Sequence, residues 1–467
     1  MRNIKLVELL SALSYNEQQS FEKYLSSHYF NTDERVKKLY DLVKKLPKNQ
    51  TEPDKKTLFK KLFPTQPYED KRMRYLFTYL SRHLENFFAL REFENDEQHH
   101  LLHLKRSLAK RKAHKAYSFA RLQFISRRKY ESPQNYLNSY LASDLHHSYA
   151  ASRFSRTSQP DYESVVAGLD RFYFLRKLQL YCELVNFKNV LKADHQVYLV
   201  EEISALITKH SFFQSKAIEI YYYILLTLTE PATEKHFEKL NALLEDSKHL
   251  FPVEEMSDMY QYVKNYCIKM INMGNDGYRQ KLFRIYKNIL SDVRLMNHGY
   301  FSQWEYKNIV TLGLRLKEIK WVGDFIRRYI HYLAPDERKN ALTYNTAMLG
   351  YHEKNYRQTV KLLREVEFSD LYYALDARSL LMKVYFETDD SETLLYHIGA
   401  FKIFLRRNKF ISAYQREIYK NYIRYTLKLF RAGATQKKLE SLRAEISGQK
   451  NISDRNWLLE RADELIS

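Results

Sequence analysis

Glycine is scarce in this chain of 467 residues, and its distribution limits what the chain can fold into. The sequence holds ten glycines, and the first of them is Gly168. Tight hairpins and phosphate-cradling loops depend on residues that adopt positive φ, and glycine is the usual choice there. The remaining composition favours helices, and 39 tyrosines and 27 phenylalanines supply bulk for packing between them. The sequence therefore predicts an all-α protein.

Positive charge is concentrated in the N-terminal third of the chain. The formal net charge is +20, and residues 1–160 hold 30 Lys or Arg against 17 Asp or Glu. A large positive field attracts nucleic acids, anionic membranes or acidic protein surfaces. The charge therefore indicates an acidic partner but does not identify its class.

The apolar residues indicate a soluble cytoplasmic protein without a secretory signal. No stretch of about 18 uncharged apolar residues occurs, so no transmembrane segment is expected. Lys5 and Glu8 also interrupt the apolar N-terminus. Two cysteines, Cys182 and Cys267, are too few for a disulfide framework or a four-thiolate metal site, and we expect buried free thiols.

The pattern along the chain suggests four segments. Residues 1–95 read as an N-terminal helical module, in which Ser14 and Glu17 form a capping box. A basic helical segment follows over 96–160, and a polar stretch around Ser158 and Pro160 marks its end. We expect an α-solenoid over 161–435 and a capping helix over 436–467.

The strongest local signal is a basic segment without acidic residues between Glu97 and Glu131. Helical spacing places its alanines and aromatic residues on one side of a single amphipathic helix over 98–130. Ten cations in this segment are the candidates for polyanion binding: Lys105, Arg106, Lys110, Arg111, Lys112, Lys115, Arg121, Arg127, Arg128 and Lys129.

Two interpretations of the basic segment stay open. Lysine and arginine at helical spacing can neutralise several phosphates and release their counterions, as a nucleic-acid contact requires. A solvated surface, or one neutralised by acidic residues elsewhere in the fold, explains the same pattern. His99 and His103 lie one helical turn apart, but without a cysteine or carboxylate partner the sequence predicts no metal site.

A repeat appears in the C-terminal half. Trp321, Tyr356 and Asp390 occupy equivalent places as the turn between two helices, spaced 35 and then 34 residues apart. Residues 304–407 resemble the tetratricopeptide repeat (TPR) family, and the best single match is Asn345 to Ser369. The resemblance implies a solenoid of stacked helix pairs that binds a partner protein. Asp324, Thr359 and Thr393 depart from the alanine that the family usually has in the second helix.

In the TPR family, residues of the first helices line a concave groove that holds a peptide. The matching positions here mix aromatic, flexible apolar and cationic side chains. The peptide-groove candidates that the resemblance implies are Lys317, Tyr344, Met348, His352, Arg378 and Met382. The lysine and asparagine set that clamps a peptide carboxylate in chaperone-binding members is not evident.

Recognised catalytic motifs are missing from the sequence. It contains no Gly-rich phosphate loop, nucleophile elbow, His-Glu-x-x-His pair or paired-cysteine spacing. We therefore predict no catalytic residues, no cofactor and no small-molecule substrate. The favoured function is a non-enzymatic scaffold or adaptor that binds a protein or peptide, and the alternative is a nucleic-acid-associated regulatory protein.

Overall fold

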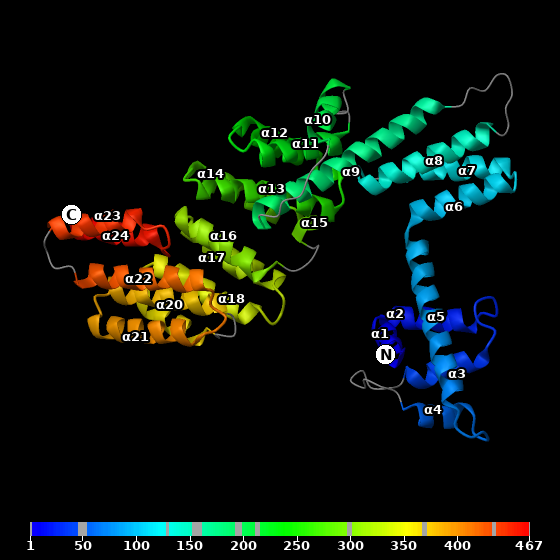
Figure 1. Ribbon diagram of the computed structural model, residues 1–467, viewed down its shortest axis with the longest axis horizontal. Helices are drawn as coiled ribbons and strands as arrows, with labels where there is room; N and C mark the ends of the chain where they lie inside the picture. The colour runs from blue at the N-terminus through cyan, green and yellow to red at the C-terminus, as the bar shows by residue number, and fades with distance from the viewer. Residues whose placement is uncertain are drawn as a thin grey trace. The chain divides into compact units, whose positions relative to one another are not determined.

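The computed structural model describes residues 2–44, 54–127, 130–151, 161–191, 199–210, 215–296, 301–366, 371–431 and 436–466. Helices make up nearly all of this part of the chain (Figure 1). No strand occurs in the described ranges, where one isolated bridge joins Phe301 to Leu333. The all-α prediction is confirmed.

The chain divides into two compact units. The first comprises Met1–Thr229 and Glu238–Phe251, and the second comprises Glu230–Phe237 and Pro252–Ser467. The division into four segments, with limits at residues 95, 160 and 435, stays a prediction. The polar stretch expected to end the second segment falls in 152–160, outside the described residues.

The first unit begins with five helices that share one apolar core. Helices α1 to α4 all pack against the long α5, and a core of buried residues runs from Leu6 to Phe87. The predicted capping box is present, because the Glu17 N–H donates to Ser14 Oγ at 3.3 Å and the Ser14 N–H to Glu17 Oε2 at 2.8 Å. The helices are α1 (Arg2–Ser11), α2 (Tyr15–Ser26), α3 (Glu34–Val43), α4 (Lys55–Leu62) and α5 (Asp70–Asn95).

Helices α6 to α12 complete the first unit. Within it α6 packs on α7 and α8, and α9 packs on α8 and α11. The helices are α6 (Glu97–Lys110), α7 (His114–Ser126), α8 (Pro133–Ala151), α9 (Tyr162–Leu191), α10 (Val200–Lys209), α11 (Lys216–Thr229) and α12 (Glu234–Ser247), followed by the 3₁₀ turn η2 (Lys248–Leu250). The first residues of α12 belong to the second unit.

The single basic helix expected over 98–130 is wrong. The chain reverses between α6 and α7, where Lys112 adopts a left-handed φ of 56° and the Ala113 N–H donates to the Leu108 carbonyl at 3.0 Å. This is a Schellman turn, which glycine usually makes because side chains disfavour left-handed φ. A lysine at the turn gives no warning in the sequence. Of the residues that helical spacing places on one side of this segment, Tyr117, Ala120 and Phe124 are buried on α7, whereas Ala116 is exposed.

The second unit contains the helices from α13 onward. With the exception of α15 and α16, consecutive helices pack against each other, and α18 also contacts α16 and α20 (Figure 1). The elements are α13 (Val253–Asn272), α14 (Gly277–Ser291), α15 (Val293–Met296), α16 (Gln303–Arg315), α17 (Ile319–Tyr329), η3 (Ile330–Tyr332), α18 (Arg338–His352), α19 (Tyr356–Glu365), α20 (Leu371–Glu387), α21 (Ser391–Arg407), α22 (Ala413–Arg431), α23 (Gln436–Gly448) and α24 (Arg455–Ile466).

Three helix pairs of this unit close with the same turn. Lys317, Lys354 and Asp389 have φ values of 61°, 58° and 52° after α16, α18 and α20. In each turn the next N–H donates to a carbonyl five residues earlier, at 2.8 to 3.1 Å. These bonds satisfy carbonyls that the end of a helix leaves without partners.

The turns correct the repeat register expected from the sequence. The three left-handed residues lie 37 and 35 residues apart, whereas the predicted spacings were 35 and 34. Trp321 is the third residue of α17. The centre of its ring lies 4.7 Å from that of the Phe283 ring and 5.4 Å from that of the Phe325 ring. The aromatic residue that suggested a turn therefore belongs to the packing surface of a helix.

Within the described ranges, no helix combines the length and the apolar character needed to cross a membrane.

Gly313 allows α16 and α17 to approach closely, and this generates a stability prediction. A Cβ atom at Gly313 would lie 2.5 Å from Val322 Cγ2 and 3.4 Å from Phe283, whereas one at Gly399 in α21 would meet nothing within 4 Å. We expect Gly313→Ala to lower the free energy of unfolding by about 1–3 kcal/mol through overpacking. Gly399→Ala should raise it by up to about 1 kcal/mol, because alanine favours a helix more than glycine does.

Urea unfolding followed by circular dichroism measures both variants. Equal effects of the two substitutions would contradict the close packing of α16 on α17.

Candidate functional site

A groove of about 820 Å³ lies in the second unit. Cavities of roughly 300–1,000 Å³ are typical of ligand-binding sites in proteins. The ends of α16, α18 and α20 contribute to its lining together with α24. We name it the C-terminal groove, and its lining residues are Arg279, Leu314, Arg315, Lys317, Tyr351, His352, Lys354, Tyr356, Lys383, Phe386, Glu387, Asp454, Asn456, Trp457, Glu460, Arg461, Glu464 and Leu465.

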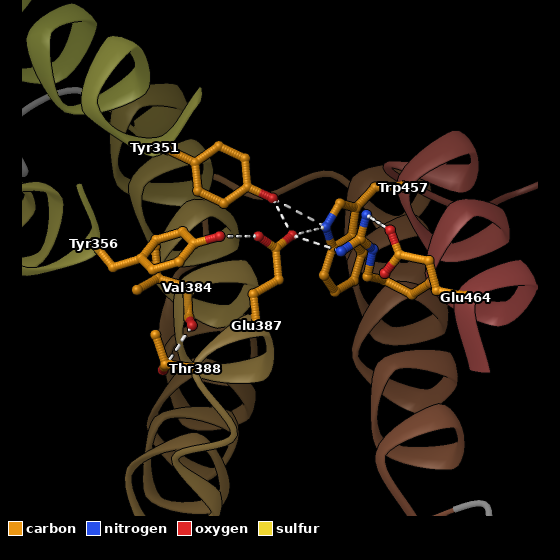
Figure 2. Close-up of polar contacts among 8 residues, drawn as sticks. Tyr351, Tyr356, Val384, Glu387, Thr388, Trp457 and Glu464 are labelled. Atoms are coloured by element: carbon orange, nitrogen blue, oxygen red, sulfur yellow. Dashed lines mark hydrogen bonds and ion pairs between the residues drawn. The ribbon is translucent and has the colours of Figure 1, made fainter. Parts of the chain in front are cut away.

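One carboxylate organises a wall of the C-terminal groove (Figure 2). Trp457 Nε1 donates to Glu387 Oε1 at 2.7 Å, and the Tyr356 hydroxyl donates to Oε2 at 2.8 Å. The Tyr351 hydroxyl also donates to Oε1, and the Arg461 guanidinium lies 3.6 Å from the same oxygen. The Glu387 side chain is 11% exposed. One side chain of α20 therefore joins α18, α19 and α24.

The two tyrosines of this network stay protonated at neutral pH. Desolvation raises the pKa of Tyr351 above its ordinary value, and the neighbouring Glu387 raises it further. Desolvation and the hydrogen bond to Glu387 raise the pKa of Tyr356 to about 12. Both hydroxyls are therefore dependable donors to the carboxylate, as a buried charge requires.

Part of the positive charge in the groove is neutralised within the fold. Lys383 Nζ lies 2.9 Å from Asp454, and Arg461 lies 2.7 Å from Glu464. Arg279 pairs with Asp276 at 2.8 Å. These side chains shape the groove but offer little net charge to a ligand.

Three further cations of the lining have no such partner. Among the described residues, no carboxylate lies within 4.0 Å of the charged ends of Arg315, Lys317 and Lys354. All three are exposed, and two of them are the left-handed turn residues after α16 and α18. The C-terminal groove therefore presents three exposed cations beside aromatic side chains, against the exposed carboxylate of Glu460, which has no cation within 4.0 Å among the described residues.

His352 contributes an uncharged ring to the same lining. Desolvation lowers its pKa, and the nearby Lys383 lowers it further. An imidazole with a pKa below its ordinary value is mostly neutral at pH 7. The cationic character of the groove thus depends on lysine and arginine.

The six peptide-groove candidates occupy different environments. Lys317 and His352 line the C-terminal groove. Tyr344 and Met382 do not, because they are 4% and 0% exposed within the apolar core. The Tyr344 ring packs 5.0 Å from Tyr373. Both predictions are wrong for a physical reason: these side chains fill the space between helices.

Met348 and Arg378 are half-buried and also lie outside the lining of the C-terminal groove. Met348 packs against the core, and the Arg378 guanidinium stacks 3.9 Å from the centre of the Phe404 ring. The sequence reasoning missed Glu387 and Trp457, which are 70 residues apart and carry no recognisable motif. Tyr356 entered the sequence analysis only as a repeat position, and Tyr351 lies within the best-matching repeat, Asn345 to Ser369.

The basic segment presents most of its cations to solvent. Arg106, Lys110 and Arg111 are exposed on α6 and the turn, as are Lys112, Lys115, Arg121 and Arg127 on the turn, on α7 and after it. Arg127 pairs with Glu97. Arg128 and Lys129 lie outside the described residues.

The burial of Lys105 contradicts the prediction that this residue contacts a polyanion. Its side chain is 1% exposed, so it cannot contact a nucleic-acid backbone. Leu101, Leu102 and Phe124 are buried nearby in the core between α6, α7 and α8. The α6 face that carries Lys105 packs inward because the chain reverses at Lys112.

The two cysteines are not suited to nucleophilic chemistry. Cys182 and Cys267 are buried and free, and desolvation raises the pKa of Cys267 to about 12 and that of Cys182 further. Both thiols are therefore protonated at neutral pH, and a thiol is a poor nucleophile. No group of three or more His, Cys, Asp or Glu side chains in the described ranges could hold a metal ion.

Comparison with protein-family models, curated proteins and solved structures found no match to this chain.

Replacing Glu387 by glutamine tests the network of the groove wall. Glutamine keeps the size of the side chain but removes the charge that strengthens the hydrogen bonds from Tyr351, Tyr356 and Trp457. We expect Glu387→Gln to lower the free energy of unfolding by about 1–3 kcal/mol.

The matched control is Glu392→Gln on the exposed surface of α21, which should change stability by less than about 0.5 kcal/mol. Urea denaturation monitored by circular dichroism compares the two. An equally small effect at Glu387 would show that the network contributes nothing to stability.

Proposed function

We propose that this protein is a non-enzymatic adaptor whose C-terminal groove binds an acidic segment of a partner protein. The observation that carries the proposal is the set of three exposed cations beside the aromatic rings of the groove, Arg315, Lys317 and Lys354, which have no carboxylate within 4.0 Å among the described residues. Positive potential in a concave site raises the encounter rate with acidic chains. Aromatic side chains provide contact area at low entropic cost.

A TPR-like arrangement of helix pairs belongs to the same proposal. In support of it, α16 and α17, α18 and α19, and α20 and α21 pair through identical turns, and neighbouring pairs also contact each other. The interval of 35 residues between the second and third turns is close to the TPR period, whereas the interval of 37 departs from it. We further propose that α1 to α5 form an N-terminal bundle ahead of this solenoid.

Peptide selection tests the adaptor function. A library of random 12-residue peptides displayed on phage and selected on the intact protein should yield sequences rich in Asp and Glu next to apolar residues. A selected peptide carrying a fluorescent label should bind the intact protein in fluorescence anisotropy. The triple variant Arg315→Glu, Lys317→Glu and Lys354→Glu should lower the affinity for this peptide at least about tenfold, which corresponds to about 1.4 kcal/mol.

The control reverses three exposed cations in and just after α21, at Lys402, Arg406 and Lys409, none of which lines the groove. It should leave the affinity unchanged within about twofold, a small change on the scale of binding free energies. Peptides without acidic enrichment, or equal losses in both triple variants, would refute the adaptor proposal.

Nucleic-acid binding by the basic segment is the second candidate function. Seven of its cations are exposed around α6 and α7, a specific observation in favour of phosphate contacts. Because the segment reverses at Lys112, these cations surround a helix hairpin instead of following one helical face. Such a surface fits a compact stretch of phosphates.

Salt-dependent RNA binding tests this second function. If Lys110, Arg111, Lys112 and Lys115 each contact one phosphate of a single strand, raising salt from 50 to 200 mM should weaken binding about 50-fold. Changing all four to glutamate should abolish that salt dependence in anisotropy measurements. Unchanged affinity of this variant would exclude the basic segment as the contact.

A further inference from the structure

A second cavity, of about 260 Å³, lies within the first unit. Its lining comes from α6, α7, α8 and the beginning of α9, and none of its residues belongs to the C-terminal groove. The chemically active groups of the lining are Lys105, Arg121, His146 and His147. We name it the Lys105 pocket.

Lys105 is a buried residue of the pocket lining with few polar partners. Its side chain lines the cavity yet is 1% exposed. The ammonium donates to the Ala142 carbonyl at 3.3 Å and lies 5.8 Å and 5.1 Å from the ring centres of Tyr117 and Phe124. Among the described residues, no carboxylate lies within 4.0 Å of it. Burying an ammonium without a counter-charge costs free energy, because the group loses its hydration.

The neighbouring groups increase this excess of positive charge. Desolvation, with a smaller contribution from the charge of Arg121, lowers the pKa of Lys105 to about 8. Desolvation also lowers the pKa of His146, with further contributions from Arg121 and Lys105. Each cation of the pocket therefore makes the protonated form of its neighbours less stable.

Asp161 is the one acidic side chain in the lining, and it is already engaged. Its carboxylate accepts the Ser164 N–H at 3.0 Å, and hydrogen bonds with Ser164 are the main cause of its lowered pKa. Among the lining residues, no acid is therefore left to serve as the direct counter-ion of Lys105.

His147 also has a buried ring nitrogen without a hydrogen-bond partner among the described residues. The Nδ1 atom of His147 is inaccessible to solvent and makes no hydrogen bond in the described part of the chain. The His147 ring lies 4.3 Å from the ring of Tyr162. A buried polar atom without a hydrogen bond costs free energy, which a ligand partner would recover.

We propose that the Lys105 pocket binds the phosphate group of a small phosphorylated molecule. A phosphate monoester carries about two negative charges and several acceptor oxygens, which suits the ammonium of Lys105, the guanidinium of Arg121 and two imidazoles. A ligand with a single carboxylate would balance the charge of only one of the two side chains Lys105 and Arg121. The volume of about 260 Å³ accommodates a compact metabolite.

This ligand sets a direction for the pH dependence of binding. A bound dianion stabilises the protonated form of Lys105, so affinity is fully present below the pKa of about 8 and falls as the pH rises through it. The other groups that face Lys105 are Arg121 and Tyr117 on α7, His146 and His147 on α8, and Asp161 before α9. Tyr117 stays neutral in this range, because burial raises its pKa to about 12.

Isothermal titration calorimetry with the intact protein tests the proposal. Ribose 5-phosphate and inorganic phosphate are the probes at pH 7, and ribose is the uncharged control. Both phosphates should bind and ribose should not, and the affinity should fall at least about tenfold between pH 7 and pH 9.5 as Lys105 loses its proton.

Lys105→Met isolates the role of the ammonium. Methionine fills the space without the charge, so we expect phosphate binding to fall at least tenfold while the unfolding midpoint stays the same or rises. Lys71→Met, at an exposed position of α5, should leave phosphate binding unchanged.

Three results would overturn the proposal. They are the absence of phosphate binding at millimolar concentration, equal binding by a folded Lys105→Met protein, and displacement of ribose 5-phosphate by single-stranded RNA without a terminal phosphate. The last result would assign the positive charge to nucleic acid instead of a small ligand. None of these outcomes depends on peptide binding in the C-terminal groove.

Discussion

The arrangement of the second unit depends on one buried carboxylate. Glu387 accepts hydrogen bonds from Tyr351, Tyr356 and Trp457, which lie on three different helices. A buried carboxylate is costly unless its oxygens are satisfied, so these helices must stay in place for the charge to be tolerated. The network thereby holds α24 against the paired helices and fixes one wall of the C-terminal groove.

The C-terminal groove and the Lys105 pocket differ in how they treat charge. In the C-terminal groove the mostly buried charge of Glu387 has several donors, and at the exposed turns Lys317 and Lys354 have no carboxylate within 4.0 Å among the described residues. In the Lys105 pocket a buried cation has one carbonyl partner and repulsive neighbours. The groove is therefore suited to attract an acidic chain to its surface, whereas the pocket is suited to take up a small anion.

Local sequence patterns predicted the helices but not their reversals. The capping box of Ser14 and Glu17 was predictable because both hydrogen bonds join residues three apart. The turn at Lys112 was not, because a lysine with left-handed φ resembles any other exposed lysine in a basic segment. The burial of Lys105 follows from that turn. Contacts such as Glu387 with Trp457 depend on tertiary packing, which no spacing in one sequence reveals.

A double-mutant cycle of Glu387→Gln and Trp457→Phe tests most directly whether this carboxylate couples α20 to α24. Urea unfolding of the two single variants and the double variant gives the coupling free energy. We expect a coupling of about 1 kcal/mol or more, because Trp457→Phe removes the hydrogen bond that Glu387→Gln weakens. Effects that add to within about 0.3 kcal/mol would contradict it, since independent sites behave in that way.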